Sequence, residues 1–89
     1  MKLNVENRTE EVYIIYVNQE RLGEIKAISK EEFLTGVIPP FKFAAEANEA
    51  FLIVVKKSGN EVVYSDNFTW KELNDMRWKI IIPDSFKNQ

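Results

Sequence analysis

Two short runs of the sequence are apolar at every position, and they limit the folds open to this chain. Residues 12–17 read Val-Tyr-Ile-Ile-Tyr-Val, and residues 51–55 read Phe-Leu-Ile-Val-Val. β-Branched and aromatic residues dominate both runs, which favours strands over helices. Successive side chains of a strand point to opposite faces, so each run is apolar on both of its faces. The sequence therefore predicts two central strands that both need cover on their second face.

Further candidate strands, only partly apolar and separated by turns such as that at residues 7–10, surround these two strands. They cover residues 3–5, 22–28, 62–64 and 78–82, and the last run stops at Pro83. About seven short strands with frequent turns are typical of an all-β domain. We therefore expect a mainly β fold, a small antiparallel β-sandwich of the immunoglobulin-like or prealbumin-like type. This is an analogy of architecture, and an α+β roll or a five-stranded barrel stays open as an alternative.

A hydroxyl residue followed three positions later by glutamate occurs twice, at Ser29 with Glu32 and at Thr69 with Glu72. This spacing is typical of a capping box, in which two side chains satisfy the free amides at a helix start. A bulky apolar pair flanks each box and fits a hydrophobic staple, Ile28 with Phe33 at the first box and Phe68 with Leu73 at the second. The sequence thus predicts short helical turns over residues 30–35 and 70–75.

The segment over residues 41–47 is ambiguous. Its phenylalanines and two of its alanines alternate as on a strand, but alanine and glutamate after a proline also suit a helix. We expect a strand, because the neighbouring segments are β. The whole pattern indicates one β-rich domain over residues 1–83, followed by a polar C-terminal tail over residues 84–89.

The composition removes most catalytic and metal chemistry. The chain has no histidine and no cysteine, so the commonest general base, the commonest metal ligand and all thiolate chemistry are missing. No glycine-rich phosphate loop or nucleophile elbow occurs. The acidic residues around 66–84 fit caps and a solvated surface better than the regular spacing of a calcium loop. We therefore expect no enzyme, no cofactor and no metal site.

Charge and hydropathy bear on the partners and on the location. Twelve basic and fourteen acidic residues give a net charge of −2, and the lysines are scattered, which disfavours nucleic acid as a partner. No signal-peptide core and no apolar run long enough to cross a bilayer occurs. The sequence thus predicts a soluble cytoplasmic protein with no membrane partner, although a leader removed earlier would leave no trace here.

Aromatic residues provide the candidate interaction or ligand face. Tyr13 and Tyr16 are three residues apart, so they point to opposite faces of the predicted strand and one of them points outward. Trp70 opens the second predicted helical turn, where an amphipathic side chain is partly exposed. Trp78 is in phase with Ile80 and Ile82 and is expected in the core.

The doubly apolar strands lead to a functional hypothesis. An apolar surface that the domain itself leaves uncovered usually marks an interaction site. We expect a non-catalytic protein-interaction or assembly module that acts through an apolar sheet face, with another protein or a second copy as its partner. The alternatives are a small-ligand or carbohydrate-binding module that uses Trp70 and the outward tyrosine, and a single-stranded nucleic-acid binder on a five-stranded barrel.

Overall fold

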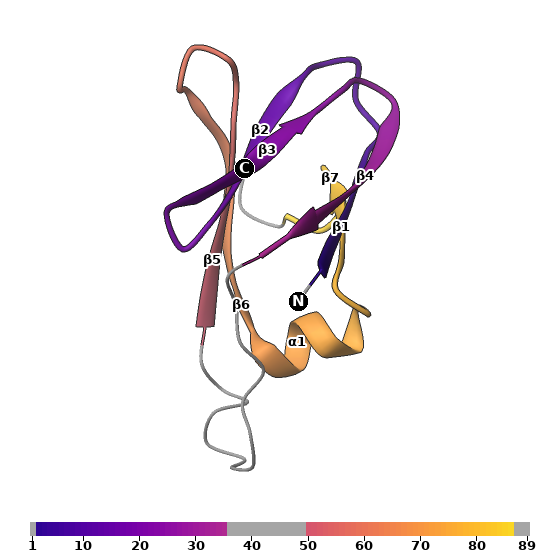
Figure 1. The fold of residues 1–89 in the computed structure, drawn as a ribbon, viewed down its shortest axis with the longest axis vertical. Helices are drawn as coiled ribbons and strands as arrows, with labels where there is room; N and C mark the ends of the chain where they lie inside the picture. Colours follow the sequence, from indigo (N-terminus) through magenta and orange to yellow (C-terminus); the bar gives the residue numbers. More distant parts are fainter. Residues whose placement is uncertain (1, 36–49, 87–89) are drawn as a thin grey trace.

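The structure is a computed structural model that describes residues 2–35 and 50–86. Within these residues, seven strands form two sheets, and one short helix lies at one end of them (Figure 1). The first sheet has the order β4 (Ser29–Leu34), β1 (Lys2–Asn7), β7 (Lys79–Ile82). The second has the order β3 (Glu20–Ile25), β2 (Tyr13–Val17), β5 (Ala50–Lys56), β6 (Val62–Thr69). The predicted small β-sandwich is confirmed, and the ambiguous segment 41–47 lies outside the described residues.

The two doubly apolar runs are the central strands of the four-stranded sheet. Buried and half-buried residues alternate along β2 and along β5, as expected for strands with one face in the core. Residues Leu3, Val5, Ile15, Ile25, Ile53, Val55, Ile80 and Ile82 are almost completely buried between the two sheets. The core therefore forms from the inner faces of both sheets, and the second faces of β2 and β5 point away from it.

One strand pair differs from the expected antiparallel pattern. β1 pairs with β4 in the antiparallel sense, but it pairs with β7 in the parallel sense. Parallel neighbours need a connection that crosses between the strands, because a hairpin can join only antiparallel ones. Here the chain passes through the whole four-stranded sheet and α1 (Trp70–Asp75) before β7 joins the strand that began the fold (Figure 1).

The second predicted capping box is confirmed, and α1 has the predicted bounds. Thr69 Oγ1 accepts the Glu72 N–H at 3.1 Å, and Glu72 Oε1 accepts the Thr69 N–H at 2.9 Å. Phe68 and Leu73, the expected staple residues, are both buried in the core. Local sequence chemistry is sufficient here to start the helix where strand β6 ends.

The first predicted capping box is wrong, because residues 30–35 form no helix. Ser29 begins β4, which pairs with β1 along all six of its residues. The Ser29 Oγ donates to the carbonyl of Lys26 at 2.6 Å and closes a turn instead of capping a helix. A full ladder of backbone hydrogen bonds and the burial of the Phe33 ring outweigh one capped turn, since helix propensity is a weak preference.

The end of the chain contributes to the core. Trp78 is buried as expected, although it lies in the turn before β7 with φ +55° and not on the strand itself. Phe86 belongs to the segment expected as a polar tail, yet it is 2% exposed. Its ring centroid lies 5.6 Å from that of Tyr64 and 5.9 Å from that of Phe68. The residues up to Phe86 thus close the sandwich beside β6.

At the edge formed by β3 and β4, away from β6, a glycine lets the two sheets pack closely. The ideal Cβ position of Gly23 on β3 lies 2.8 Å from Cε1 of Phe33 on β4, closer than real Cβ atoms approach a neighbour. The absence of a side chain on β3 lets the Phe33 ring pack across from the other sheet. The two sheets can therefore approach each other at this edge.

This contact predicts the effect of Gly23→Ala. The added methyl group must displace the Phe33 ring, and we expect the free energy of unfolding to fall by about 1–3 kcal/mol, as for an overpacked core. Urea unfolding followed by circular dichroism measures the change. Gly59→Ala is the matched control, because no atom lies within 4 Å of its Cβ position and its stability should change by about 0.5 kcal/mol or less. Equal losses for both variants would contradict the close approach.

Candidate functional site

The outer surface of the four-stranded sheet is apolar along its two central strands. Here β2 presents Ile14 and Tyr16, and β5 presents Leu52 and Val54, all of them half-buried. Tyr16 lies opposite Val54 in the β2–β5 ladder, and residues opposite each other share a face of the sheet. We call these four residues the apolar face.

Charged and polar residues border the apolar face on both sides. Arg21 and Glu24 of β3 lie opposite Tyr16 and Ile14 in the β2–β3 ladder. On β5, the Lys56 Nζ lies 4.5 Å from the centroid of the Tyr16 ring, the geometry of a cation–π contact. A shallow hollow of about 130 Å³ beside this pair is lined in part by Val54. The face therefore combines an apolar centre with a rim that carries both charge signs.

The structure does not bring the three predicted aromatic residues together. Tyr13 is buried in the core, with its ring edge-on to Tyr64 at a centroid distance of 6.0 Å. Tyr16 belongs to the apolar face, on the other side of the same strand. Trp70 starts α1 and packs on Trp78 at 5.0 Å, where it is half-buried. Of the three residues, Tyr16 alone contributes to the outer sheet surface.

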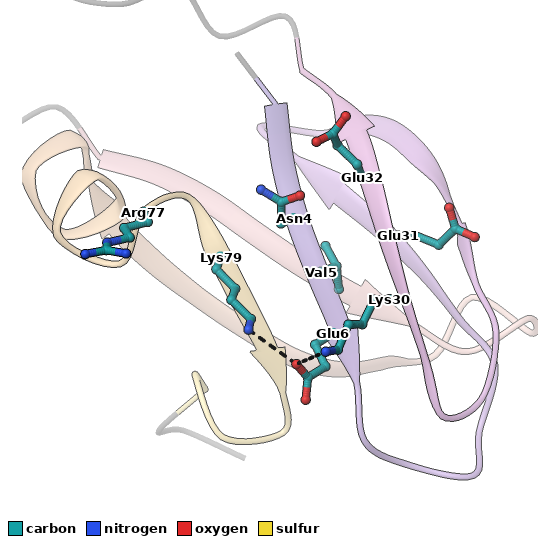
Figure 2. Close-up of a pocket in the computed structure, with 8 residues that line it drawn as sticks. All are labelled: Asn4, Val5, Glu6, Lys30, Glu31, Glu32, Arg77 and Lys79. Atoms are coloured by element: carbon teal, nitrogen blue, oxygen red, sulfur yellow. Dashed lines mark ion pairs between the residues drawn. The ribbon is translucent and has the colours of Figure 1, made fainter.

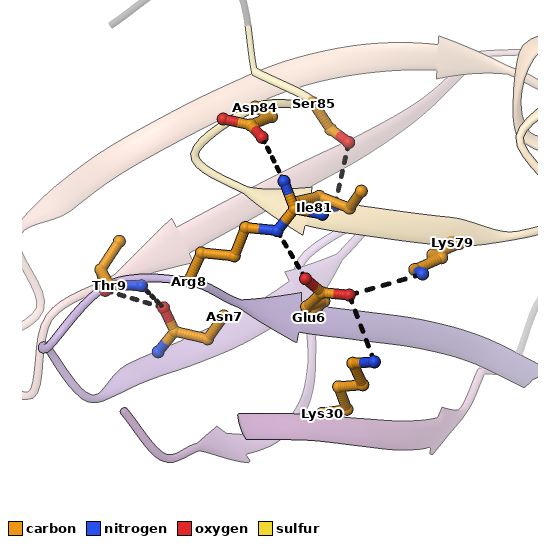
Figure 3. Close-up of polar contacts among 9 residues, drawn as sticks. All are labelled: Glu6, Asn7, Arg8, Thr9, Lys30, Lys79, Ile81, Asp84 and Ser85. Atoms are coloured by element: carbon orange, nitrogen blue, oxygen red, sulfur yellow. Dashed lines mark hydrogen bonds and ion pairs between the residues drawn. The ribbon is translucent and has the colours of Figure 1, made fainter. Parts of the chain in front are cut away.

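A second candidate site lies on the outer surface of the three-stranded sheet, where basic side chains surround Glu6. The Glu6 Oε1 atom lies 3.4 Å from Lys79 Nζ and 3.8 Å from Lys30 Nζ (Figure 2). Its Oε2 atom accepts from Arg8 Nε at 2.5 Å, and Arg8 Nη1 also donates to Asp84 Oδ2 at 2.8 Å (Figure 3). We call Glu6, Arg8, Lys30, Lys79 and Asp84 the Glu6 cluster.

The cluster borders a hollow of about 480 Å³. Side chains from β1 and β4, with Arg77 and Lys79 from the last part of the chain, line this hollow (Figure 2). Asn4 and Glu6 share the outer face of β1, because alternate residues of a strand point the same way. The alternation of residues 2–6 could have placed these two side chains on one face. The pairing of β4 and β7 with β1, which brings the two lysines beside them, could not be predicted from the sequence.

The electrostatics of the cluster favour the charged forms of its members. Hydrogen bonding from Arg8, and then the nearby positive charges, hold the pKa of the Glu6 carboxyl below its usual range, although partial burial acts in the opposite direction. The same contact with Glu6 raises the pKa of Arg8 further. Glu6 is therefore ionised over a wider range of acid pH than a free glutamate.

This lowered pKa predicts a pH-dependent effect of Glu6→Gln. A carboxyl whose pKa is lower in the folded than in the unfolded state stabilises the fold above its unfolded pKa. That contribution is lost as the pH falls through the folded-state value. We expect Glu6→Gln to lower the urea midpoint at neutral pH and to approach wild type as the pH falls below the usual range of a glutamate carboxyl and through the lowered folded-state pKa of Glu6.

Glu61→Gln is the control for the removal of one carboxylate. Glu61 lies 3.9 Å from the ammonium of Lys57 and is exposed, so its replacement should change the midpoint less at neutral pH. If the difference between Glu6→Gln and wild type stays constant from neutral to acid pH, the stabilising role of the cluster is wrong.

Next to Glu6, the buried side chain of Asn7 joins two loops. Its Nδ2 donates to the carbonyl oxygens of Glu11 at 2.7 Å and of Lys26 at 3.0 Å. Its Oδ1 accepts from the backbone N–H of Thr9 at 3.0 Å and from the Thr9 hydroxyl at 2.7 Å (Figure 3). The sequence indicated only a turn here, whereas the amide fixes the β1–β2 and β3–β4 connections to each other.

No protein-family model, no curated protein and no solved structure matches this chain. Within residues 2–35 and 50–86, no group of three acidic, histidine or cysteine side chains could hold a metal ion, and no helix has the length and apolar character to cross a membrane.

Proposed function

We propose that this chain is a non-catalytic interaction module whose partner is a second copy of itself, bound through the apolar face. The observation that carries the proposal is the partial exposure of four apolar side chains on adjacent central strands. Contiguous apolar surface of this kind commonly marks an interaction site. The cytoplasmic location inferred from the sequence stays a prediction.

The charge pattern of the rim supports a second copy as the occupant. In a two-fold dimer the same surface meets itself, so it must be self-complementary. Arg21, Glu24 and Lys56 place both charge signs around the apolar centre. Two copies can therefore bury the centre and still oppose unlike charges at the rim.

Two of the sheet edges, those of β7 and β6, are less suited to docking than this face. The Ile81 N–H donates to Ser85 Oγ at 2.9 Å, and the Ser85 N–H donates to the Ile81 carbonyl at 2.7 Å, so the outer edge of β7 is already paired. On β6, the carboxylates of Asp66 and Glu72 accept the N–H groups of Asn67 and Thr69. Edges protected in this way resist pairing with another strand.

The size of the face predicts the strength of association. The whole outer surface of the four-stranded sheet, of which the apolar face is the central part, covers roughly 300–400 Å² at a typical strand separation. Stable interfaces bury about 800 Å² on each partner. We therefore expect a weak dimer with a dissociation constant of about 10–100 μM, and sedimentation velocity over a concentration series should detect it.

The Tyr16→Glu variant tests the role of the apolar face. The introduced carboxylate lies beside Lys56, which lets the fold tolerate it, but it places a charge at the centre of the proposed interface. We expect association to weaken by at least about ten-fold. Leu34→Glu is the matched control, because Leu34 is an exposed apolar residue on β4 of the other sheet.

Each outcome of this experiment bears on the proposal. A wild-type chain that stays monomeric at every concentration overturns it, as does a Tyr16→Glu variant that associates like wild type. An equal loss in Leu34→Glu would show that any exposed apolar residue drives the association. Circular dichroism confirms that each variant is folded.

A further inference from the structure

The hollow beside the Glu6 cluster presents ammonium groups to solvent and keeps its central carboxylate beneath them. The side chains of Lys30 and Lys79 are 76% and 46% exposed, whereas that of Glu6 is 13% exposed. The two ammonium groups lie 3.8 and 3.4 Å from Glu6 Oε1, farther than in a tight charge-assisted hydrogen bond. A lysine ammonium has three donors, so both lysines keep donors for another acceptor.

Three carboxylates line this hollow, and other contacts engage two of them, Glu6 and Glu32. Arg8 donates to both Glu6 and Asp84, so the three basic members of the Glu6 cluster exceed its two carboxylates by one charge. Glu32 Oε1 lies 3.4 Å from Lys2 Nζ, and Glu31 points away from Glu6 (Figure 2). With Lys2 and Arg77 also counted, five basic and four acidic side chains surround the hollow, an excess of one positive charge in a chain that carries −2.

Asn4 and Arg77 add two further donor groups to the same hollow. Asn4 lies opposite Lys79 in the β1–β7 ladder, so both side chains point to the outer face. Within residues 2–35 and 50–86, neither the Asn4 amide nor the Arg77 guanidinium has a side-chain hydrogen bond or ion pair. A guanidinium fork matches the geometry of carboxylate and phosphate groups.

We propose that this hollow binds an acidic peptide segment. One carboxylate or phosphate group of the peptide lies between the ammonium groups of Lys30 and Lys79, and a second acidic group reaches Arg77. The volume of about 480 Å³ suits a short segment better than a single small anion. The groups that would hold the peptide are all side-chain donors on the outer surface of the sheet, so binding of this kind adds no strand.

This site goes beyond the proposed self-association and does not depend on it. The apolar face belongs to the four-stranded sheet, whereas the hollow lies on the outer surface of the three-stranded sheet. One chain could therefore hold a second copy on one side and an acidic partner on the other. The Tyr16→Glu variant, in which self-association is weakened, should still bind the acidic peptide.

To test the proposal, acidic peptides are titrated into the ¹⁵N-labelled full chain at low ionic strength. The amide chemical shifts of the chain report where and how tightly each peptide binds. The probes are the synthetic peptide Gly-Asp-phosphoserine-Asp-Gly, its unphosphorylated form, and inorganic phosphate alone. We expect both peptides to shift amides of β1, β4 and β7, with the phosphorylated peptide binding more tightly and inorganic phosphate binding least. Added salt should weaken each interaction, because exposed charges are screened.

Variants separate the site from the general charge of the chain. We expect the double variant Lys30→Gln with Lys79→Gln to bind the phosphorylated peptide about ten-fold more weakly, at about 0.5–1 kcal/mol for each exposed pair. Lys57→Gln is the matched control, because Lys57 is also an exposed lysine in a loose ion pair, 3.9 Å from Glu61. The control should bind like wild type.

Several results would overturn the proposal. They are the absence of shifts with either peptide, shifts confined to other strands, and equal affinity of the double variant and wild type. If inorganic phosphate binds and neither peptide does, the hollow is a site for a free anion and not for an acidic peptide. An equal loss of peptide affinity in Lys57→Gln would show that the affinity depends on the net charge of the chain and not on this hollow.

Discussion

Asn7→Asp is expected to lower the free energy of unfolding by about 3–5 kcal/mol at neutral pH. The amide is 1% exposed and donates to two carbonyl oxygens, one in each of the loops that it joins. A carboxylate keeps the two acceptor contacts with Thr9 but cannot donate. Both carbonyls would then face a buried negative charge in place of an N–H group.

The pH dependence of this variant identifies the cause of the loss. Burial next to carbonyl oxygens raises the folded-state pKa of the introduced carboxyl above its unfolded value, so the penalty disappears as the carboxyl takes up a proton. We expect part of the lost stability to return as the pH falls through the acid range, because a protonated carboxyl can donate once. Urea unfolding at several pH values measures both effects.

Asn4→Asp is the matched control in the same strand. Asn4 lies on the outer face of β1 and is exposed, next to Lys79, so its replacement should change stability by about 0.5 kcal/mol or less. If Asn7→Asp and Asn4→Asp unfold at similar urea concentrations, the amide of Asn7 does not hold the two loops together.

Trp78→Ala is expected to have an effect of similar size, about 3–5 kcal/mol, as for other buried aromatic truncations. The indole packs against Trp70 at a centroid distance of 5.0 Å and against Phe51 at 6.3 Å. An 89-residue domain typically has about 4–13 kcal/mol of total stability. The variant therefore loses a large share of the stability of the fold, and its thermal midpoint should fall steeply.

The Trp78→Phe variant keeps an aromatic ring in the core but removes the indole N–H, so it separates the effect of packing from that of hydrogen bonding. We expect this variant to fold even if Trp78→Ala does not. Within the described part of the chain, the buried Trp78 Nε1 has no hydrogen-bond partner, which is a cost that phenylalanine removes. We expect a loss of about 1 kcal/mol or less, well below that of alanine. A loss as large as that of Trp78→Ala would show that Nε1 contributes a bond to the folded state.

The two capping boxes show how far local sequence determines this fold. Thr69 is the last residue of β6 and Glu72 lies in the first turn of α1, and there the local contacts decide the outcome. Ser29 and Glu32 have the same spacing, but they lie where β1 offers a complete pairing partner. A single sequence does not contain that register, so the same local signal gives a helix at one position and a strand at the other.

The candidate sites also differ in how far they could be predicted from the sequence. The apolar face follows from alternation within β2 and β5, and its presence could be predicted from residues 12–17 and 51–55 alone. The Glu6 cluster needs three strands in register, with Lys30 opposite Glu6 on one side and β7 on the other. Asn7 looked like an ordinary turn residue, because its burial depends on a loop nineteen positions later.

The parallel pairing of β1 with β7 also has a consequence for the order of folding. The strands of the β5–β6 hairpin are close in sequence, so they can pair soon after they are synthesised. Strand β1 is made before the other described strands but receives its second neighbour only when residues 79–82 have left the ribosome. During synthesis the nascent chain therefore carries a strand with an open side, and that interval is when a chaperone or a neighbouring nascent chain could pair with it.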